Sequence, residues 1–127
     1  MEKLISDFLA QKTFAVAGSF RDDSKYAYRI LKALKHKGYD VYPVHPVIKE
    51  VEGLCCYSSV KDIPFTIDVV NLVTPPAVTE SILVECKDKG IRKIWLQPGA
   101  ENEKAIQYCK DNGMDVVYQV CVMMKTA

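Results

Sequence analysis

The chain has 127 residues, 49% of them apolar and 26% charged, and its 17 basic and 16 acidic residues leave a net charge of +1. These values are typical of one globular domain with a continuous core, and they argue against a nucleic-acid-binding module, which would carry a clear basic excess. Because no apolar stretch approaches the roughly 20 residues that cross a bilayer, and the N-terminus lacks a signal-peptide pattern, we expect a cytoplasmic protein that binds no membrane.

Short β-branched runs alternate with helical patterns along a single domain of residues 1–127. In chain order they predict a strand at residues 13–17 that ends at Gly18, a helix at 25–37, strands at 40–44 and 68–73, a helix that Pro75 and Pro76 open and Gly90 ends, a strand at 93–96, a helix at 101–111 and a strand at 115–118. Pro43 places the second strand near an edge of the sheet, or lies at a strand end. The alternation predicts an α/β fold: a doubly wound, mainly parallel five-stranded Rossmann-like sheet with helices on both faces.

The helix that begins at Pro75 and Pro76 carries Val78, Ile82 and Cys86 at helical spacing, and we expect these three side chains to face the core. Residues 48–63 contain turn residues and fit no regular pattern. We expect one short helical turn in this segment, and the pattern does not assign the rest of it.

Polar or conformationally special residues gather where the predicted strands end. In an open parallel sheet, ligands bind beyond these carboxyl ends, at the point where the strand order reverses. The residues in question are Gly18, Ser19, Phe20 and Arg21 after the first strand, His45 and Pro46 after the second, Thr74, Pro75 and Pro76 after the third, Gln97 and Gly99 after the fourth, and Cys121 after the fifth.

The turn after the first strand has the residue types of a phosphate site. Gly18 lets the backbone turn sharply and approach a ligand, Ser19 offers a hydroxyl, and the loop leads into a helix N-terminus. Arg21 and Lys25 add positive charge. The alternative is that Gly18 only eases a chain reversal and that both charges are solvated.

The same turn lacks the features of a dinucleotide site. The fingerprint needs GxGxxG and an acidic residue at the end of the second strand. Residues 18–23 read GSFRDD, and the second strand ends in Val44-His45-Pro46 with no carboxylate. Both departures disfavour NAD.

Several segments together resemble the stand-alone CoA-binding domain family, which is similar to the CoA-binding domain of succinyl-CoA synthetase. They are FAVAGSFRDDSKYAYRILKALKHKGYDVYPVHP, EGLCCYSSVKDIP, DVVNLVTPP and IRKIWLQPGAENEKA, followed by the late Cys121. The resemblance runs from about Phe14 to Val122. It implies a doubly wound fold that binds coenzyme A and has no established reaction of its own.

Carried over by position, the resemblance implies which residues would contact the phosphates of coenzyme A. Gly18 and Ser19 would meet the pyrophosphate. Arg21 and Lys25 would be its charge partners, and Lys49 would reach the 3′-phosphate.

The resemblance also implies which residues would surround the rest of the bound coenzyme A. Thr74, Pro75 and Pro76 would wall the pocket. Gln97 and Gly99 would line the route of the pantetheine chain.

The adenosine half would lie beside His45 and Pro46. Here the sequence departs from the family, which usually reads Pro-Val-Asn-Pro where this chain has Pro43-Val44-His45-Pro46. A neutral imidazole can replace one hydrogen bond of the asparagine.

The cysteines form an odd set without a CxxC pair, so no zinc site is expected, and we interpret them as reduced and mostly buried thiols: Cys55, Cys56, Cys86, Cys109 and Cys121. Asp22 and Asp23 are expected to form a solvated turn and not a metal site. His45 has no evident partner that would make it a catalytic base, and no catalytic residue is predicted.

The resulting interpretation is a module that binds coenzyme A or an acyl-CoA, with no protein partner indicated. Two alternatives stay open. One is an enzyme or redox protein that acts on the CoA thiol through Cys121, because family members often carry a cysteine at the matching place. The other is a module that senses a nicotinamide dinucleotide.

Overall fold

The computed structural model describes residues 1–126, and its centre is one sheet of five parallel strands. Along the sheet the order is β2 (Asp40–Val44), β1 (Thr13–Gly18), β5 (Val69–Val73), β6 (Lys93–Leu96) and β7 (Asp115–Tyr118). The chain leaves β1 toward β2 on one side and later builds the other three strands on the opposite side. The strand order therefore reverses between β1 and β5, as the doubly wound prediction requires.

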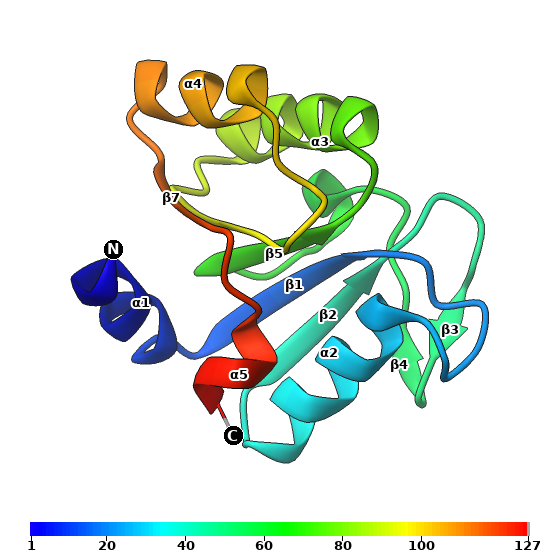
Figure 1. Cartoon of the computed structure of the whole chain (residues 1–127). Coiled ribbons are helices and arrows are strands. Elements are labelled where there is room, and N and C mark those ends of the chain that lie inside the picture. Colours follow the sequence, from blue (N-terminus) through cyan, green and yellow to red (C-terminus); the bar gives the residue numbers. More distant parts are fainter. Residues whose placement is uncertain (127) are drawn as a thin grey trace.

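In the described part of the chain, five α-helices cover the two faces of this sheet (Figure 1). One face carries α1 (Glu2–Leu9), α2 (Tyr26–His36) and α5 (Val122–Thr126). The other carries α3 (Pro76–Lys89) and α4 (Glu103–Asp111). Each face encloses its own apolar core, and the strand interiors are buried on both sides, which explains their nearly continuous apolar sequences. The fold class is confirmed.

The helix ends follow local chemistry. Asn102 caps α4, because its side-chain oxygen accepts a hydrogen bond from the backbone N–H of Ala105 at 2.7 Å. For this reason α4 begins at Glu103, two residues after the predicted start. At the other end of α3, Gly90 adopts a φ of 85° and terminates the helix as predicted.

The inner face of α3 differs from the prediction. The buried residues are Thr79, Leu83 and Cys86, whereas Val78 is 46% exposed. The prediction that Val78 faces the core is therefore wrong. Val78 and the half-buried Ile82 form a second stripe, one residue out of phase with the buried stripe, and this second stripe faces the cavity described below.

Residues 48–63 contain a hairpin that the sequence pattern did not predict. Its strands are β3 (Glu50–Val51) and β4 (Leu54–Cys55), and they are joined by Glu52 and Gly53, whose φ angles are 51° and 74°. Two positive φ angles are typical of the type I′ turn, which matches the twist of a hairpin. The expected short helical turn is the 3₁₀ helix η1 (Val60–Asp62).

The end of this segment lies along the edge strand β2. The backbone N–H of Tyr57 donates to the carbonyl of Pro43 at 3.0 Å, and the N–H of His45 donates to the carbonyl of Tyr57 at 2.9 Å. The edge position predicted from Pro43 is confirmed. As a result, Ser58 lies close to the carboxyl end of β2.

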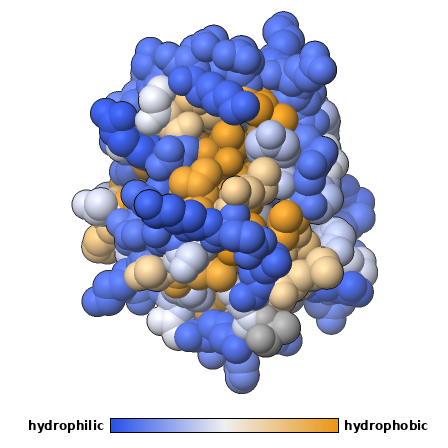
Figure 2. Space-filling model, turned by 60° about the vertical axis from the view of Figure 1, so that its left-hand side comes forward, coloured by the Kyte–Doolittle hydropathy of each residue, from blue (hydrophilic) through white to orange (hydrophobic). Residues whose placement is uncertain are grey.

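The opposite edge of the sheet is β7. Figure 2 shows this side of the molecule, where a strip of hydrophobic side chains runs between hydrophilic surfaces. Within residues 1–126, no helix combines the length and the apolar character that crossing a membrane would need.

Candidate functional site

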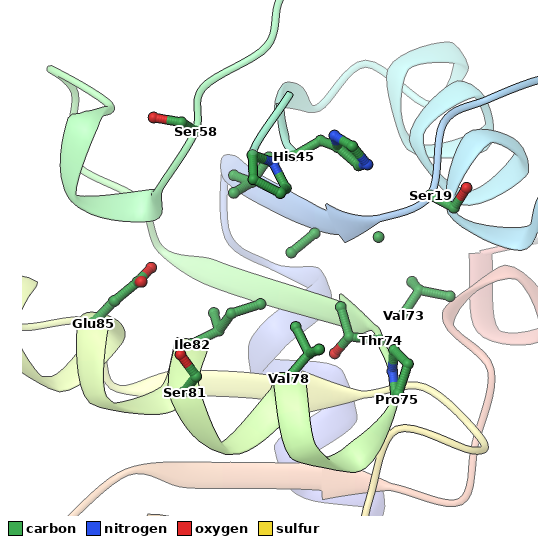
Figure 3. Close-up of a pocket in the computed structure, with 14 residues that line it drawn as sticks. Ser19, His45, Ser58, Val73, Thr74, Pro75, Val78, Ser81, Ile82 and Glu85 are labelled. Atoms are coloured by element: carbon green, nitrogen blue, oxygen red, sulfur yellow. The ribbon is translucent and has the colours of Figure 1, made fainter. Parts of the chain in front are cut away.

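A cavity of about 450 Å³ opens at the carboxyl ends of β1, β2 and β5. This is the point where the strand order reverses, which is the general place for ligands in open α/β sheets. Its volume falls within the roughly 300–1,000 Å³ of small-molecule sites. The cavity lies between the strand ends, Ser58 in the segment before η1, and the face of α3 that carries Val78 and Ile82 (Figure 3).

The structure brings six of the residues predicted from the sequence together in the lining of this cavity. They come from the ends of three neighbouring strands: Gly18, Ser19, His45, Pro46, Thr74 and Pro75. Their common position follows from the parallel sheet, because the carboxyl ends of parallel strands meet at one edge.

Sequence reasoning missed the other wall. It consists of Val78, Ser81, Ile82 and Glu85, which project from one side of α3, and of Ser58 near η1 (Figure 3). The available signal was the spacing of Val78, Ser81, Ile82 and Glu85 at helical intervals, which places them on one stripe. Ala17, Val44 and Val73 complete the lining from the strands.

The remaining predicted residues lie outside the cavity lining. Arg21 and Lys49 are exposed and Lys25 is half-buried at the N-terminal cap of α2, while Phe20 is buried in the core under the first loop. Pro76 stands in the first turn of α3, and Gly99 is exposed beyond β6.

Gly18 is required for a reason other than the expected sharp turn. It is the last residue of β1 and has no positive φ. A Cβ at this position would lie 2.6 Å from the Cβ of Ala27 and 2.8 Å from the carbonyl oxygen of Val73. The missing side chain thus allows α2 and β5 to pack closely against the end of β1.

The loop between β1 and α2 is fixed by its own residues. Phe20 is 4% exposed and anchors the loop in the core. The carboxylate of Asp22 accepts hydrogen bonds from the hydroxyl and from the backbone N–H of Ser24, and these bonds lower the pKa of Asp22. Within residues 1–126, no group of three or more metal-ligating side chains is assembled, at Asp22 or elsewhere.

His45 closes the turn after β2 through its ring. The backbone N–H groups of Val47 and Ile48 both donate to Nδ1, each at 3.1 Å. A nitrogen that accepts two hydrogen bonds carries no proton, so the ring proton is on Nε2. Nδ1 occupies the role that a side-chain oxygen of asparagine plays in such a turn, which accounts for the tolerance of histidine at this position.

The start of α3 is held to the end of β5 by two threonines. The hydroxyls of Thr74 and Thr79 are 2.7 Å apart, and Thr79 is fully buried. This contact fixes the position of Pro75 and of the first turn of α3 relative to the sheet. This contact therefore joins the α3 wall of the cavity to the strand ends that form its floor.

Gln97 belongs to a buried network and not to the cavity. It is 2% exposed, its Nε2 donates to Oδ1 of Asn71 at 2.9 Å, and its Oε1 accepts from the backbone N–H of Val122 at 3.1 Å. Next to it, Nε1 of Trp95 donates to the carbonyl of Val120 at 2.7 Å. Both side chains hold the segment that leads into α5.

The five cysteines differ in their surroundings. Cys55 is exposed, whereas Cys121 is only 7% exposed and does not line the cavity. Burial raises the pKa of Cys56 and of Cys109 to about 11, and it raises the pKa of Cys86 further. The expectation of mostly buried thiols is confirmed for all except Cys55.

Comparison with known proteins relates this site to a family. A family model described as "CoA binding domain" matches residues 12–127. The uncharacterized protein YneT of Bacillus subtilis is 30% identical over 91% of this chain and 86% of its own length. A hypothetical protein of Pyrococcus horikoshii has a similar solved structure, with a TM-score of 0.92 and 33% identity over 98% of this chain and 87% of that one.

Longer relatives contain the same unit. The alpha subunit of the ADP-forming acetate–CoA ligase II of Pyrococcus furiosus is 30% identical over 94% of this chain. This chain spans only 28% of that subunit. The similarity therefore concerns one domain of the ligase subunit.

Proposed function

Because this chain belongs to the CoA binding domain family, we propose that it is a cytoplasmic module that binds coenzyme A at the carboxyl edge of its sheet, and that occupancy by the ligand is its function. The proposal extends to the individual residues of the site. The reaction of the longer ligases involves a much larger chain, and no part of it is assigned here to the single domain.

The cavity at the reversal between β1 and β5 is the observation that carries the proposal. It combines apolar walls with a few convergent polar groups, which is the general design of a small-molecule site. The apolar part suits the adenosine half of the ligand, between Pro46 on one side and Val78 and Ile82 on the other. The longer pantetheine chain exceeds this volume and would continue along the sheet edge.

The phosphates, in this proposal, lie at the turn formed by Gly18 and Ser19. Ser19 lines the cavity, and the loop leads to the first turn of α2, whose N–H groups favour negative charge. Arg21 and Lys25 supply mobile charge from the same loop, and within residues 1–126 neither of them forms an ion pair. Lys49 would reach the 3′-phosphate from the exposed turn after β2.

The pantetheine chain would pass the wall made by Thr74, Pro75 and Pro76 and then Gly99. Gln97 would not contact the pantetheine chain directly. It would shape the path of this chain by positioning the backbone at Val122. The thiol of the ligand would end on the side of the sheet where Cys121 follows β7.

Two measurements on the purified protein test the proposal. Native mass spectrometry should show a bound mass equal to that of coenzyme A, and titration calorimetry with added coenzyme A should give a dissociation constant in the micromolar range or below. Two or three charge-assisted hydrogen bonds of about 1.5–3 kcal/mol each are sufficient for such an affinity. The absence of both signals would refute the proposal.

A further inference from the structure

The two ends of the cavity differ in chemistry. Figure 3 shows Ser19 at one end, beside the strand ends, and Glu85 at the other end, beyond Ile82 on α3. Of the lining residues, only His45 and Glu85 have ionisable side chains. A carboxylate therefore marks one end of the cavity, and the Ser19 end has none.

The carboxylate of Glu85 is held in place. The hydroxyl of Ser59 donates to Oε1 at 2.8 Å, and the same hydroxyl oxygen caps η1 by accepting from the backbone N–H of Lys61 at 3.1 Å. Oε2 makes no hydrogen bond to any described residue, and the side chain is half-buried beside the cavity. Glu85 therefore presents a fixed acceptor whose second oxygen is free.

The apolar residues beside Glu85 suit a flat ring. Val78 and Ile82 lie on the same side of α3 as Glu85 (Figure 3). Val44, at the end of β2, and Pro46, in the turn after it, also line the cavity. Val78 points toward this space (Figure 3) and is 46% exposed. A base placed between these walls would cover Val78 and bring its edge to the carboxylate.

We propose that Glu85 accepts a hydrogen bond from the exocyclic amino group of adenine, and that this contact fixes the direction of the ligand in the cavity. The carboxylate repels phosphate, so the phosphates lie at the Ser19 end and the base lies at the Glu85 end. An amino group is a donor and pairs with a carboxylate, whereas a carbonyl oxygen at the same position of the base would face it unpaired. The inference rests on the proposed binding of coenzyme A and adds the group that recognises its base.

The test compares coenzyme A with its deamino analogue, in which hypoxanthine replaces adenine and a carbonyl replaces the amino group. We expect the wild-type protein to bind coenzyme A about tenfold more tightly than the analogue, the effect of one hydrogen bond to a charged acceptor. In Glu85→Gln the amide can turn its NH₂ group toward the carbonyl, so the ratio should fall below about threefold. The dissociation constants are measured by titration calorimetry.

Glu80→Gln is the matched control, because Glu80 is another carboxylate of α3 and does not line the cavity. This variant should keep the preference for coenzyme A. Thermal unfolding without ligand shows whether each variant is folded, and Glu85→Ala serves as a second variant that should also lose the preference.

The outcomes separate the two proposals. Equal affinities of the wild-type protein for both ligands, or an unchanged ratio in Glu85→Gln, would refute the role of Glu85 and leave the binding of coenzyme A intact. No binding of coenzyme A by the wild-type protein would refute both.

Discussion

Gly18 and Ala27 are so close that a Cβ on Gly18 would lie 2.6 Å from the Cβ of Ala27. The same atom would lie 2.8 Å from the carbonyl oxygen of Val73, so the crowding comes from two sides. We expect Gly18→Ala to destabilise the fold by about 1–3 kcal/mol, the range of overpacked core positions. Urea unfolding measures the change.

Ala27→Gly should relieve part of this crowding, because it removes one of the two clashing groups. In a double-mutant cycle, the variant that carries both Gly18→Ala and Ala27→Gly should lose less free energy of unfolding than the two single variants lose together. Strict additivity of the two substitutions would contradict the packing role of Gly18.

Coenzyme A should raise the melting temperature more than NAD or NADP at equal concentration. The physical reason is mass action on the folded state, combined with a first turn that lacks the second and third glycines of the dinucleotide fingerprint and a β2 end that lacks its carboxylate. Differential scanning fluorimetry with the three ligands gives the order. A larger shift with NAD would favour the nicotinamide-sensing alternative.

Arg21→Ala and Lys25→Ala should each weaken the binding of coenzyme A by about tenfold, because each removes a charge partner of the phosphates. Both residues lie in the loop before α2, and little effect on stability is expected. Lys37→Ala is the control, since Lys37 is an exposed cation at the opposite end of the same helix. Rising salt should weaken binding to the wild-type protein, because ions screen exposed charges.

Calorimetry of the three variants measures these effects. If Lys37→Ala weakened binding as much as the other two, the effect would be one of general charge, and the phosphate site would not be at this loop.

Cys55 should react first with a small alkylating reagent near pH 8. It is the exposed thiol, whereas burial and pKa values of about 11 protect Cys56 and Cys109. Cys121 should react slowly because it is 7% exposed. Peptide mass mapping after short exposures gives the order of labelling.

A mixed disulfide between Cys121 and coenzyme A is a separate hypothesis. Because Cys121 is buried, the reaction requires the structure around this thiol to open. Incubation with CoA disulfide should place the adduct on Cys121, and Cys121→Ser should abolish it. An adduct on Cys55 alone would show ordinary surface exchange.

Asp68 links the beginning of β1 to the beginning of β5 through hydrogen bonds. Because of this contact, the stability of the fold should depend on pH in the acidic range. Its carboxylate accepts from the backbone N–H groups of Lys12 and Thr13, each at 3.1 Å. Burial by itself would raise the pKa of Asp68, but these bonds outweigh it and hold the pKa below the ordinary 3.8. A depressed pKa means that the stabilisation is complete above about pH 4 and is lost as the pH falls through the lowered value.

We therefore expect Asp68→Asn to be less stable than the wild-type protein at pH 7 by about 1–2 kcal/mol, because the amide oxygen is a weaker acceptor. The difference should narrow below pH 4. Urea unfolding at pH 7, 5 and 3 measures it, and a difference that stays constant would exclude the carboxylate as the cause.

The strands could be predicted because each is an apolar run bounded by glycine, proline or charge. The hairpin could not, because strands of two residues have no readable period, and its turn uses Glu52 with Gly53 where asparagine or aspartate is usual. Propensity alone therefore contains no signal for it. Its formation follows from tertiary contacts, such as the hydrogen bond from Tyr28 to the carboxylate of Glu52 at 2.6 Å.

The candidate site was predictable where it comes from strand ends and unpredictable where it comes from α3. That helix has two stripes at the same spacing, and both are compatible with a buried face: Val78 and Ile82 in one, Thr79 and Leu83 in the other. The sheet selects the second stripe, because Thr79 bonds to Thr74 and fixes the rotation of the helix. The spacing of residues in the sequence does not reveal this rotation of the helix. For the same reason it did not predict that Glu85 lines the cavity.

The way in which Trp95 and Gln97 hold the C-terminal segment has a consequence for hydrogen exchange. A helix of five residues is too short to be stable alone. Its first backbone amides would ordinarily exchange their hydrogens rapidly with solvent, because helix ends fray. The N–H of Val122 is instead bonded to the buried side chain of Gln97, directly after β6 of the central sheet. Deuterium should therefore reach this amide only when the core itself opens, so the first residue of α5 shares the cooperative unfolding unit of the sheet.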